Sequence, residues 1–373
     1  MSTAFSVTSF VLACIAAFAA ATASHADDTT AQRTTPVIAF VGCAHIHTPE
    51  FVGQLRKHAA DVKVKCVWDH DAARAKKRAD ELGVPVESDL SKIWADPQIT
   101  AVVIASETDR HLELITAAAK AKKQIYAEKP LGMGTKDAYA MAQAVQDAGL
   151  LFQTGYFMRG DPTLMFLKQQ VQSGAFGKIT RIRGSNCHSG ALGGWFDGEW
   201  RWMADPKLAG VGAFGDLGTH SLDIMLWLMN EPVTRATATV APGTARYENC
   251  DELGEGIMVF ASGAIGTLAA SWDDVANPVS LEISGTEGHA TIVNGKLYFQ
   301  SKKVKGADGK APWTDLPKSL PRPLELFIEA INGKADVPLV TVGEAAYRCG
   351  VMDALYQGAR DQKWVAPEPL EKK

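Results

Sequence analysis

The chain has 373 residues, which at roughly 150 residues per domain suggests about two domains. Its 46% hydrophobic and 21% charged residues are typical of a soluble globular protein. A net charge of −4 excludes the strongly basic surface of a nucleic-acid-binding protein, and the short basic clusters around Arg74 and Lys120 lie on expected helices as solvated residues.

The first 26 residues differ from the rest of the chain. They contain no Asp, Glu, Lys or Arg, they include the apolar run Phe10–Ala21, and they end in the small-x-small sequence SHA. This pattern predicts a secretory signal peptide that is cleaved after Ala26, followed by a linker over residues 27–36. The run is too short to span a bilayer comfortably, so a secreted or periplasmic protein without a stable membrane anchor is expected. Because the segment lacks basic residues, an uncleaved N-terminal membrane anchor is the alternative.

Between residues 37 and 150, strand and helix patterns alternate. The apolar runs VIAFVG, VKVKCVWD, AVVIAS and QIYAEKP are typical of strands buried on both faces, and amphipathic helical segments separate them. Such βαβ units have right-handed crossovers and form a parallel sheet. Residues 37–150 are therefore predicted to form a doubly wound α/β Rossmann domain.

After Tyr156 the pattern changes. Segments of alternating polarity predict antiparallel strands, with HATIVNGKLYF as one strand and ADGKAPWTDLPKSLPRP as a surface loop. Helices are predicted at GDLGTHSLDIMLWLMN, LELFIEAIN and VGEAAYRCGVMDALYQGARD. Residues 151–373 are thus expected to form an α+β domain with a large open, mainly antiparallel sheet, whose C-terminal helices pack back on the Rossmann domain.

The five cysteines that follow the signal segment have no metal-ligand spacing. They are odd in number, and the mature chain is too large to need disulfide bonds. Buried free thiols are therefore expected at Cys43, Cys66, Cys187, Cys250 and Cys349.

The turn after the first predicted strand is suited to a dinucleotide. A buried strand, then Gly42, then a helix directs helical N–H groups at a pyrophosphate. Asp69 ends the next strand, where a carboxylate can accept the ribose hydroxyls and repel a 2′-phosphate. No arginine follows Asp69 directly, so NAD is favoured over NADP.

The rest of this turn departs from the usual glycine pattern. Ala44 and His47 stand where two further glycines are usual. Thr48 as N-cap and Pro49 as first helical residue predict a longer loop and a helix that begins near Pro49.

A metal site built on His45 and His47 is the alternative for this turn. Two histidines at this spacing chelate only in an extended segment, and the only nearby residue that could complete the set is Glu50. We therefore expect no metal, and we expect both histidines to border the cofactor phosphates or the nicotinamide.

Two further motifs carry catalytic residue types. In AEKPLG, Lys129 ends a strand at the carboxyl edge of the sheet, where ligands bind, and the following proline favours an extended backbone. In GDLGTHSLD, Asp216 and His220 are four residues apart and share a helix face. A histidine there can accept a hydroxyl proton, Asp216 can stabilise the imidazolium, and Asp223 is a candidate partner of His220.

These motifs, in this order, resemble the Gfo/Idh/MocA family of oxidoreductases. The resemblance runs from Val37 to the C-terminus and is carried by AVVIASETDRH, AEKPLG, WRWMADPKLAGVGAFGDLGTHSLD and ISGTEGHATI. It implies hydride transfer between nicotinamide and a hydroxyl of a sugar, cyclitol or related polyol, with Lys129, Asp216 and His220 as the catalytic set. It also implies that residues 151–373 form the substrate and oligomerisation domain, and that the protein is a dimer or tetramer.

The resemblance also implies roles for residues around this set. The expected cofactor contacts are Gly42, Cys43, Ala44, His45, His47, Asp69, Ser106, Glu107, His111, Glu128 and Lys129. The expected substrate contacts are Tyr156, Arg159, Trp200 and Arg201, and the indoles of Trp195, Trp200 and Trp202 could stack on a pyranose.

Nicotinamide cofactors are made inside the cell, which conflicts with the export of an enzyme that uses them. Two other functions are therefore alternatives. One is a secreted glycoside-processing enzyme that oxidises and then re-reduces its substrate on a bound NAD, with no net redox change. The other is a non-catalytic protein that binds a sugar or a nucleotide.

Overall fold

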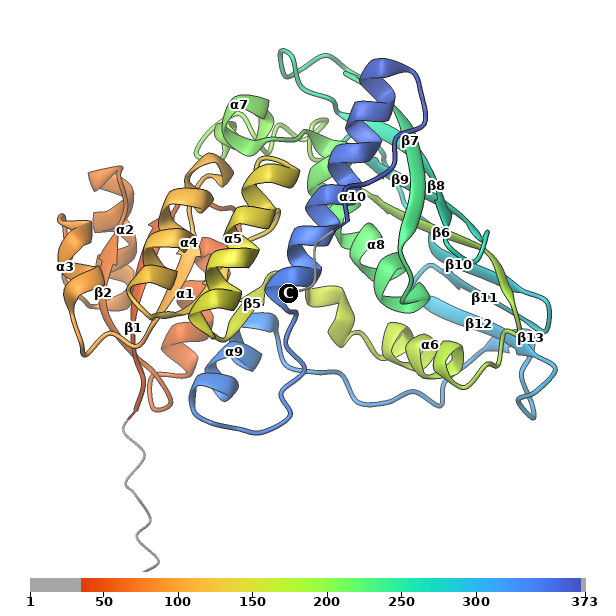
Figure 1. Ribbon diagram of the computed structural model, residues 1–373, viewed down its shortest axis with the longest axis horizontal. Coiled ribbons are helices and arrows are strands. Elements are labelled where there is room, and N and C mark those ends of the chain that lie inside the picture. Colours follow the sequence, from red (N-terminus) through yellow and green to blue (C-terminus); the bar gives the residue numbers. More distant parts are fainter. Residues whose placement is uncertain (1–34, 370–373) are drawn as a thin grey trace, which may run out of the picture. The chain divides into compact units, whose positions relative to one another are not determined.

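Two sheets organise residues 35–369, the part of the chain that the computed structural model describes (Figure 1). Both sheets belong to one compact unit that begins at Thr35. The predicted signal peptide lies outside the described residues. Within them, none of the helices has the length and apolarity that a bilayer crossing requires.

The first sheet is entirely parallel, with strand order β2-β1-β3-β4-β5. Its strands are β1 (Val37–Cys43), β2 (Lys63–Trp68), β3 (Ala101–Ala105), β4 (Gln124–Ala127) and β5 (Phe152–Thr154), connected by α1 (Thr48–Lys57), α2 (Ala72–Leu82), α3 (Leu90–Ala95), α4 (His111–Lys120) and α5 (Thr135–Ala148). Apolar side chains of α4 and α5 cover one face, and those of α1 and α2 cover the other. The predicted Rossmann-type sheet is confirmed, and its central strands are buried because both faces are covered.

The second sheet has eight strands in the order β13-β12-β11-β10-β6-β9-β8-β7. Their bounds are β6 (Ile179–Cys187), β7 (Val233–Ala241), β8 (Leu253–Phe260), β9 (Ile265–Ser271), β10 (Val279–Gly285), β11 (Gly288–Val293), β12 (Lys296–Ser301) and β13 (Asp308–Pro312). Only the β6–β9 pair is parallel, which confirms the predicted open, mainly antiparallel sheet.

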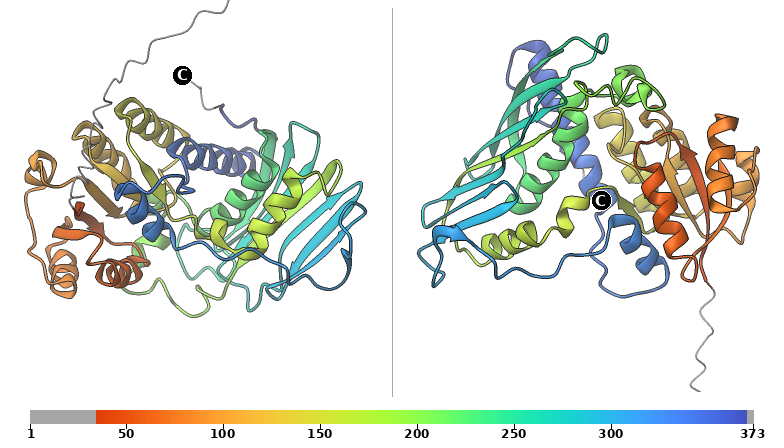
Figure 2. Two further views of the ribbon diagram at one scale, coloured as in Figure 1. Left: turned by 90° about the horizontal axis from the view of Figure 1, so that it is seen from below. Right: turned by 180° about the vertical axis from the view of Figure 1, so that it is seen from behind.

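Helices cover one face of the second sheet, the face turned toward the first sheet (Figures 1 and 2). These are α6 (Pro162–Gln172), α8 (Ala213–Met229) and α10 (Val342–Asp361). The long helix α8 packs against β6 and β9, and α10 lies against both α5 and β7. Helix α9 (Pro323–Ile331) contacts β4 and β5, so the end of the chain contributes to the packing of both sheets.

Two sequence predictions about this half are wrong. HATIVNGKLYF is not one strand but the hairpin β11–β12, because Asn294 and Gly295 both adopt positive φ (48° and 72°). An Asn-Gly pair favours this tight turn, whose twist matches that of antiparallel strands. The predicted loop that follows contains strand β13, which pairs with β12 through Tyr298 and Gln300.

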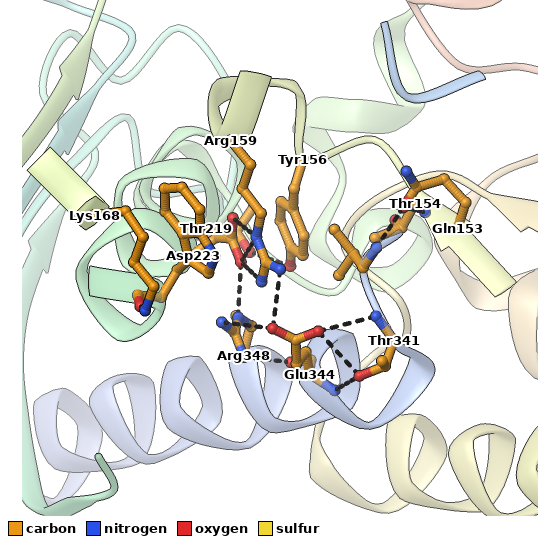
Figure 3. Close-up of polar contacts among 12 residues, drawn as sticks. Gln153, Thr154, Tyr156, Arg159, Lys168, Thr219, Asp223, Thr341, Glu344 and Arg348 are labelled. Carbon is orange, nitrogen blue, oxygen red and sulfur yellow. Dashed lines mark hydrogen bonds and ion pairs between the residues drawn. The ribbon is translucent and has the colours of Figure 1, made fainter. Parts of the chain in front are cut away.

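A buried charge cluster joins the end of the first sheet to α8 and α10 (Figure 3). Asp223 of α8 accepts hydrogen bonds from Arg348 of α10 (Nε to Oδ1, 2.8 Å) and from Arg159 (Nη2 to Oδ1, 2.6 Å). Arg159 lies in the short turn after β5 and also pairs with Glu344 of α10 at 2.9 Å. Because charges this buried need close partners, the cluster fixes how α8 sits between the two sheets.

Replacing Asp223 should strongly destabilise the fold. In Asp223→Ala, two buried guanidinium groups lose their shared carboxylate, and we expect the free energy of unfolding to fall by about 3–5 kcal/mol. Urea denaturation followed by circular dichroism measures this. The matched control is Asp80→Ala, which removes an exposed partner of Lys76 and should cost less than about 1 kcal/mol. Equal losses in the two variants would contradict a structural role for the cluster.

Candidate active site

Lys129 and Asp216 form a buried ion pair between the two sheets. Lys129 follows β4 at the carboxyl edge of the first sheet, and its Nζ donates to Asp216 Oδ1 at 2.7 Å. Asp216 lies in the first turn of α8, and its Oδ2 accepts from the indole of Trp272 at 3.2 Å. The structure therefore brings together two predicted residues that are 87 positions apart.

His220 completes the group one helical turn after Asp216. It is buried between the rings of Tyr156 and Phe157, with centroids at 6.1 and 4.9 Å. Its Nδ1 is buried and has no hydrogen-bond partner among the described residues. That nitrogen is thus available to a bound molecule.

The electrostatics give these groups distinct charge states. Burial and the Lys129 ammonium both hold the pKa of His220 well below its ordinary value. Burial alone would raise the pKa of Asp216, but the Lys129 ammonium outweighs it and lowers the pKa to about 2. At neutral pH the site therefore holds an aspartate and an uncharged imidazole, which is the form of histidine that can accept a proton.

The first turn of α8 is held by residues that no sequence motif marked. The Tyr356 hydroxyl accepts from the amides of Gly215 (2.9 Å) and Gly212 (3.3 Å) and donates to Asp251. Asp251 in turn accepts from the amide of Phe214 at 2.9 Å. These contacts satisfy helix N–H groups that otherwise lack partners, and so they position Asp216.

One position at the end of β1 accepts only glycine. Gly42 has φ +79°, and a Cβ there would lie 2.5 Å from Cβ of Ser106, so only glycine fits. Helix α1 begins at Thr48 itself, with His47 at the N-cap and no side-chain capping bond, so the predicted Thr48 cap is wrong. The Thr48 hydroxyl is buried and makes no hydrogen bond within the described residues.

A segment of the second half covers this turn. The indole of Trp202 donates to the carbonyl of Ala44 at 3.0 Å. Nearby, Glu199 pairs with Lys77 and Arg78 of α2 at 2.9 and 3.0 Å. Trp202 is therefore engaged by the turn and is not free to stack on a sugar.

Trp195, Trp200 and Arg201 are the other expected substrate-side residues of this segment. Trp195 is half-exposed and stacks on His188, with ring centroids at 4.7 Å. Trp200 is partly buried, and its indole nitrogen makes no hydrogen bond within the described residues. The Arg201 guanidinium lies over the ring of Tyr247 at 5.1 Å. Trp195 and Trp200 remain candidates for stacking on a sugar ring.

Tyr156, Arg159 and Asp223 each have side-chain partners within the chain. The Tyr156 hydroxyl and Thr219 Oγ1 are hydrogen-bonded at 2.9 Å and buried. Arg159 pairs with Asp223 and Glu344, so its guanidinium supports the fold. Asp223 binds two arginines and is not the partner of His220. The pattern of residues could not reveal this, because the competing arginine of α10 lies 125 positions away.

Asp69 also differs from its predicted environment. Its carboxylate accepts from Arg74 (Nη2 2.7 Å, Nε 3.1 Å) and from the amides of Cys43 (2.6 Å) and Asp71 (2.8 Å). Arg74 also reaches Glu107 at 2.8 Å. Although no arginine follows Asp69 directly, the first turn of α2 brings one to it. A ribose hydroxyl can therefore bind Asp69 only when Arg74 moves.

The loop after β3 presents polar atoms at the same carboxyl edge. His111 Nδ1 donates to the carbonyl of Leu131 at 3.1 Å, which leaves Nε2 as an acceptor, and burial lowers the pKa of this ring. His111 Nε2 and Glu107 Oε2 are buried without partners among the described residues, while Ser106 Oγ donates to the Glu107 carbonyl at 3.1 Å. These unpartnered atoms and the bare Gly42 turn fit a dinucleotide at this edge.

Two cavities share Phe157, whose ring lies 4.9 Å from that of His220. The larger measures about 520 Å³ and is lined by Phe157, Ser221, Leu281 and Arg322, among others. The smaller measures about 160 Å³ and shares Phe157 and Arg322, but reaches His47 and Glu128. The buried Ser221 hydroxyl lines the larger cavity and has no partner among the described residues, so that cavity offers a polar contact to a bound molecule.

Comparison with known proteins identifies the family. Residues 37–156 match the model of the oxidoreductase family with an NAD-binding Rossmann fold, and residues 164–291 match the GFO/IDH/MocA C-terminal domain. The scyllo-inositol 2-dehydrogenase (NAD(+)) of Bacillus subtilis is 31% identical over 255 residues, which cover 67% of this chain and 71% of that protein. The chain belongs to the Gfo/Idh/MocA family.

A further relative and a solved structure resemble the chain in sequence and in fold. Levoglucosan dehydrogenase of Pseudarthrobacter phenanthrenivorans is 31% identical over 224 residues, which are 54% of this chain and 57% of that protein. A structure of levoglucosan dehydrogenase in complex with NADH and levoglucosan has the same fold, with a TM-score of 0.75 and 22% identity. That match covers 90% of this chain and all of the other. The predicted family and its NAD-binding domain are confirmed.

Removing Arg74 should sharpen the choice of cofactor. In Arg74→Ala the acceptor positions of Asp69 become free for ribose hydroxyls, and a 2′-phosphate loses a positive partner. We expect the ratio of NAD to NADP affinity to rise about tenfold, in line with the loss of one charged hydrogen bond. Fluorescence titration with both dinucleotides measures this ratio, with Lys76→Ala on the exposed face of α2 as control. An unchanged ratio in Arg74→Ala would show that Arg74 does not act on the ribose site.

Proposed function

We propose that the protein is an NAD-dependent dehydrogenase that transfers a hydride between nicotinamide and a carbinol carbon of a sugar, a cyclitol or a related polyol. The observation that carries the proposal is the buried Lys129–Asp216 pair, with an uncharged His220 one helical turn away. The relatives support the substrate class, because they are named as dehydrogenases of inositols and of levoglucosan.

The protein side of the reaction follows from the positions of these groups. The bound nicotinamide supplies the hydride acceptor. His220, uncharged and buried, takes the proton of the substrate hydroxyl. Lys129 donates a hydrogen bond to the same oxygen and stabilises the negative charge that develops there. Asp216 holds the ammonium in place through Oδ1, while Trp272 fixes the other carboxylate oxygen.

The residues expected at the cofactor support NAD as the partner. The turn at Gly42, which has no side chain, suits the pyrophosphate, and Asp69 with Glu107 suits the adenosine ribose once Arg74 has moved. The buried Nε2 of His111 offers an acceptor next to the Lys129 loop.

The same proposal places the protein outside the cytoplasm, as a soluble secreted or periplasmic enzyme. The support is the composition of residues 1–26, with their apolar run and small-x-small end. A dimer or tetramer through the second sheet is part of the proposal too, because no helix of residues 35–369 covers its outer face (Figure 1).

Activity assays with two variants test the function. Purified mature protein with NAD and a panel of sugars and cyclitols should produce NADH. Lys129→Met and His220→Asn should each lower kcat/KM by about 10²–10⁴-fold, since each removes a group that acts on the reacting oxygen. Neither should change the Kd for NAD more than a few-fold.

The control is Lys120→Met, an exposed lysine at the end of α4 that should leave kcat/KM unchanged. NADH formation that survives in Lys129→Met and His220→Asn would overturn the proposed roles. Hydrolysis of an aryl glycoside without net NADH would favour the glycoside-processing alternative. NAD binding with neither activity would favour a non-catalytic protein.

A further inference from the structure

Three side chains with metal-binding atoms meet between the first turn and the end of β4. His47 Nδ1 lies 3.3 Å from Glu128 Oε1, and His45 Nε2 lies 3.8 Å from Glu128 Oε2. One ligand atom from each of the three lies within 4.8 Å of the others. We propose that His45, His47 and Glu128 bind a divalent first-row transition ion, for which Zn²⁺ is the probe. This goes beyond the proposed dehydrogenase activity and does not depend on it.

The donor set and its spacing fit such an ion. Two imidazoles and one carboxylate are a ligand set of catalytic zinc sites. At metal–ligand distances of about 2.0–2.1 Å, neighbouring ligands of a tetrahedral ion are about 3.3 Å apart. The His47–Glu128 distance already has this value, and the His45–Glu128 distance exceeds it by half an ångström (3.8 against 3.3 Å).

The two arguments against a metal at this turn do not hold in the structure. The His-x-His segment is a turn and not an extended strand, yet it brings the two rings to a centroid distance of 4.6 Å. The carboxylate is supplied by Glu128, which is 81 positions beyond His47 in the chain and adjacent to it in space. Proximity along the sequence had left only Glu50 as a candidate.

The environment of Glu128 favours a cation. Its side chain is 0% exposed, and within the described residues its only ion-pair contacts are with these two histidines. Lys129, the next residue, directs its ammonium to Asp216 and gives Glu128 only its backbone amide, at 2.9 Å. A buried carboxylate with so little positive charge around it is costly, and a divalent ion would supply that charge.

Binding requires a change of tautomer at both histidines. His45 Nδ1 accepts a 3.2 Å hydrogen bond from the amide of His47, so the neutral ring carries its proton on Nε2. Ligation through Nε2 needs the tautomer with the proton on Nδ1, and the His47 amide must then turn away. His47 Nδ1 must likewise give up the proton that it donates to Glu128 Oε1 at 3.3 Å, so two long hydrogen bonds are lost, while the His45 backbone stays anchored to the carbonyl of Ala105 at 2.9 Å.

The site leaves room for a further ligand. His47 and Glu128 line the cavity of about 160 Å³, and His47 is 30% exposed. A Cβ at Gly155 would lie 2.8 Å from Glu128 Oε2, so glycine keeps the space next to the carboxylate open. Water or a hydroxyl oxygen of a bound molecule can therefore complete the coordination from the cavity.

A metal titration tests the proposal. Untagged mature protein is freed of metal with a chelator and titrated with ZnCl₂ by calorimetry, and bound zinc is counted by mass spectrometry after gel filtration. We expect one Zn²⁺ per chain. His47→Ala and Glu128→Gln should each weaken binding by at least about 100-fold, since even residues behind the ligands contribute 10–100-fold.

The matched control is His58→Ala, which removes a histidine bound to Asp61 and Glu325 and should leave zinc affinity unchanged. Circular dichroism confirms folding, and the partly exposed His47 gives a variant that keeps the fold even if Glu128→Gln does not. Absence of stoichiometric zinc, or equal weakening by His47→Ala and His58→Ala, overturns the site. NADH formation is assayed separately on metal-free protein, so failure of one proposal is distinguishable from failure of the other.

Discussion

The buried ion pair between Lys129 and Asp216 is the interaction on which the site depends. Lys129 belongs to the carboxyl edge of the parallel sheet, and Asp216 belongs to the helix that lies on the antiparallel sheet. Neither charge is stable at that depth alone, because removing one partner leaves an uncompensated buried ion. The pair therefore requires that α8 and β4 meet in one position. Burial and the Lys129 ammonium together lower the pKa of His220, so the pair also contributes to keeping this imidazole uncharged.

Other contacts hold α8 in the position that this pair requires. Tyr356 and Asp251 bind its first turn, and two arginines bind Asp223 further along. The turn after Gly42, where the cofactor is expected, is fixed in a similar way. The indole of Trp202, from the second half of the chain, donates a hydrogen bond to the carbonyl of Ala44 in this turn. The catalytic geometry thus comes from both sheets together, with charged and polar contacts that cross from one to the other.

Local patterns predicted the order of strands and helices, the two sheets and the three catalytic candidates, because apolar periodicity and the AEKPLG and GDLGTHSLD motifs are local signals. Contacts between distant residues could not be predicted in this way. Arg74 reaches Asp69 from the next helix, Arg348 competes for Asp223 from 125 positions away, and Glu128 joins His45 and His47 only in the folded chain. The Thr48 cap failed for a local reason, since the helix starts one residue earlier than the proline suggested.

The most direct test of the central claim is the pH dependence of kcat/KM for oxidation of a sugar or cyclitol substrate, which reports ionisations of the free enzyme. Because burial and Lys129 depress the pKa of His220, the base is already uncharged near pH 6.5. The account predicts that kcat/KM stays level as the pH falls through 6.5 and declines only in distinctly more acidic solution. A decline centred near the ordinary histidine pKa of about 6.5 would contradict it.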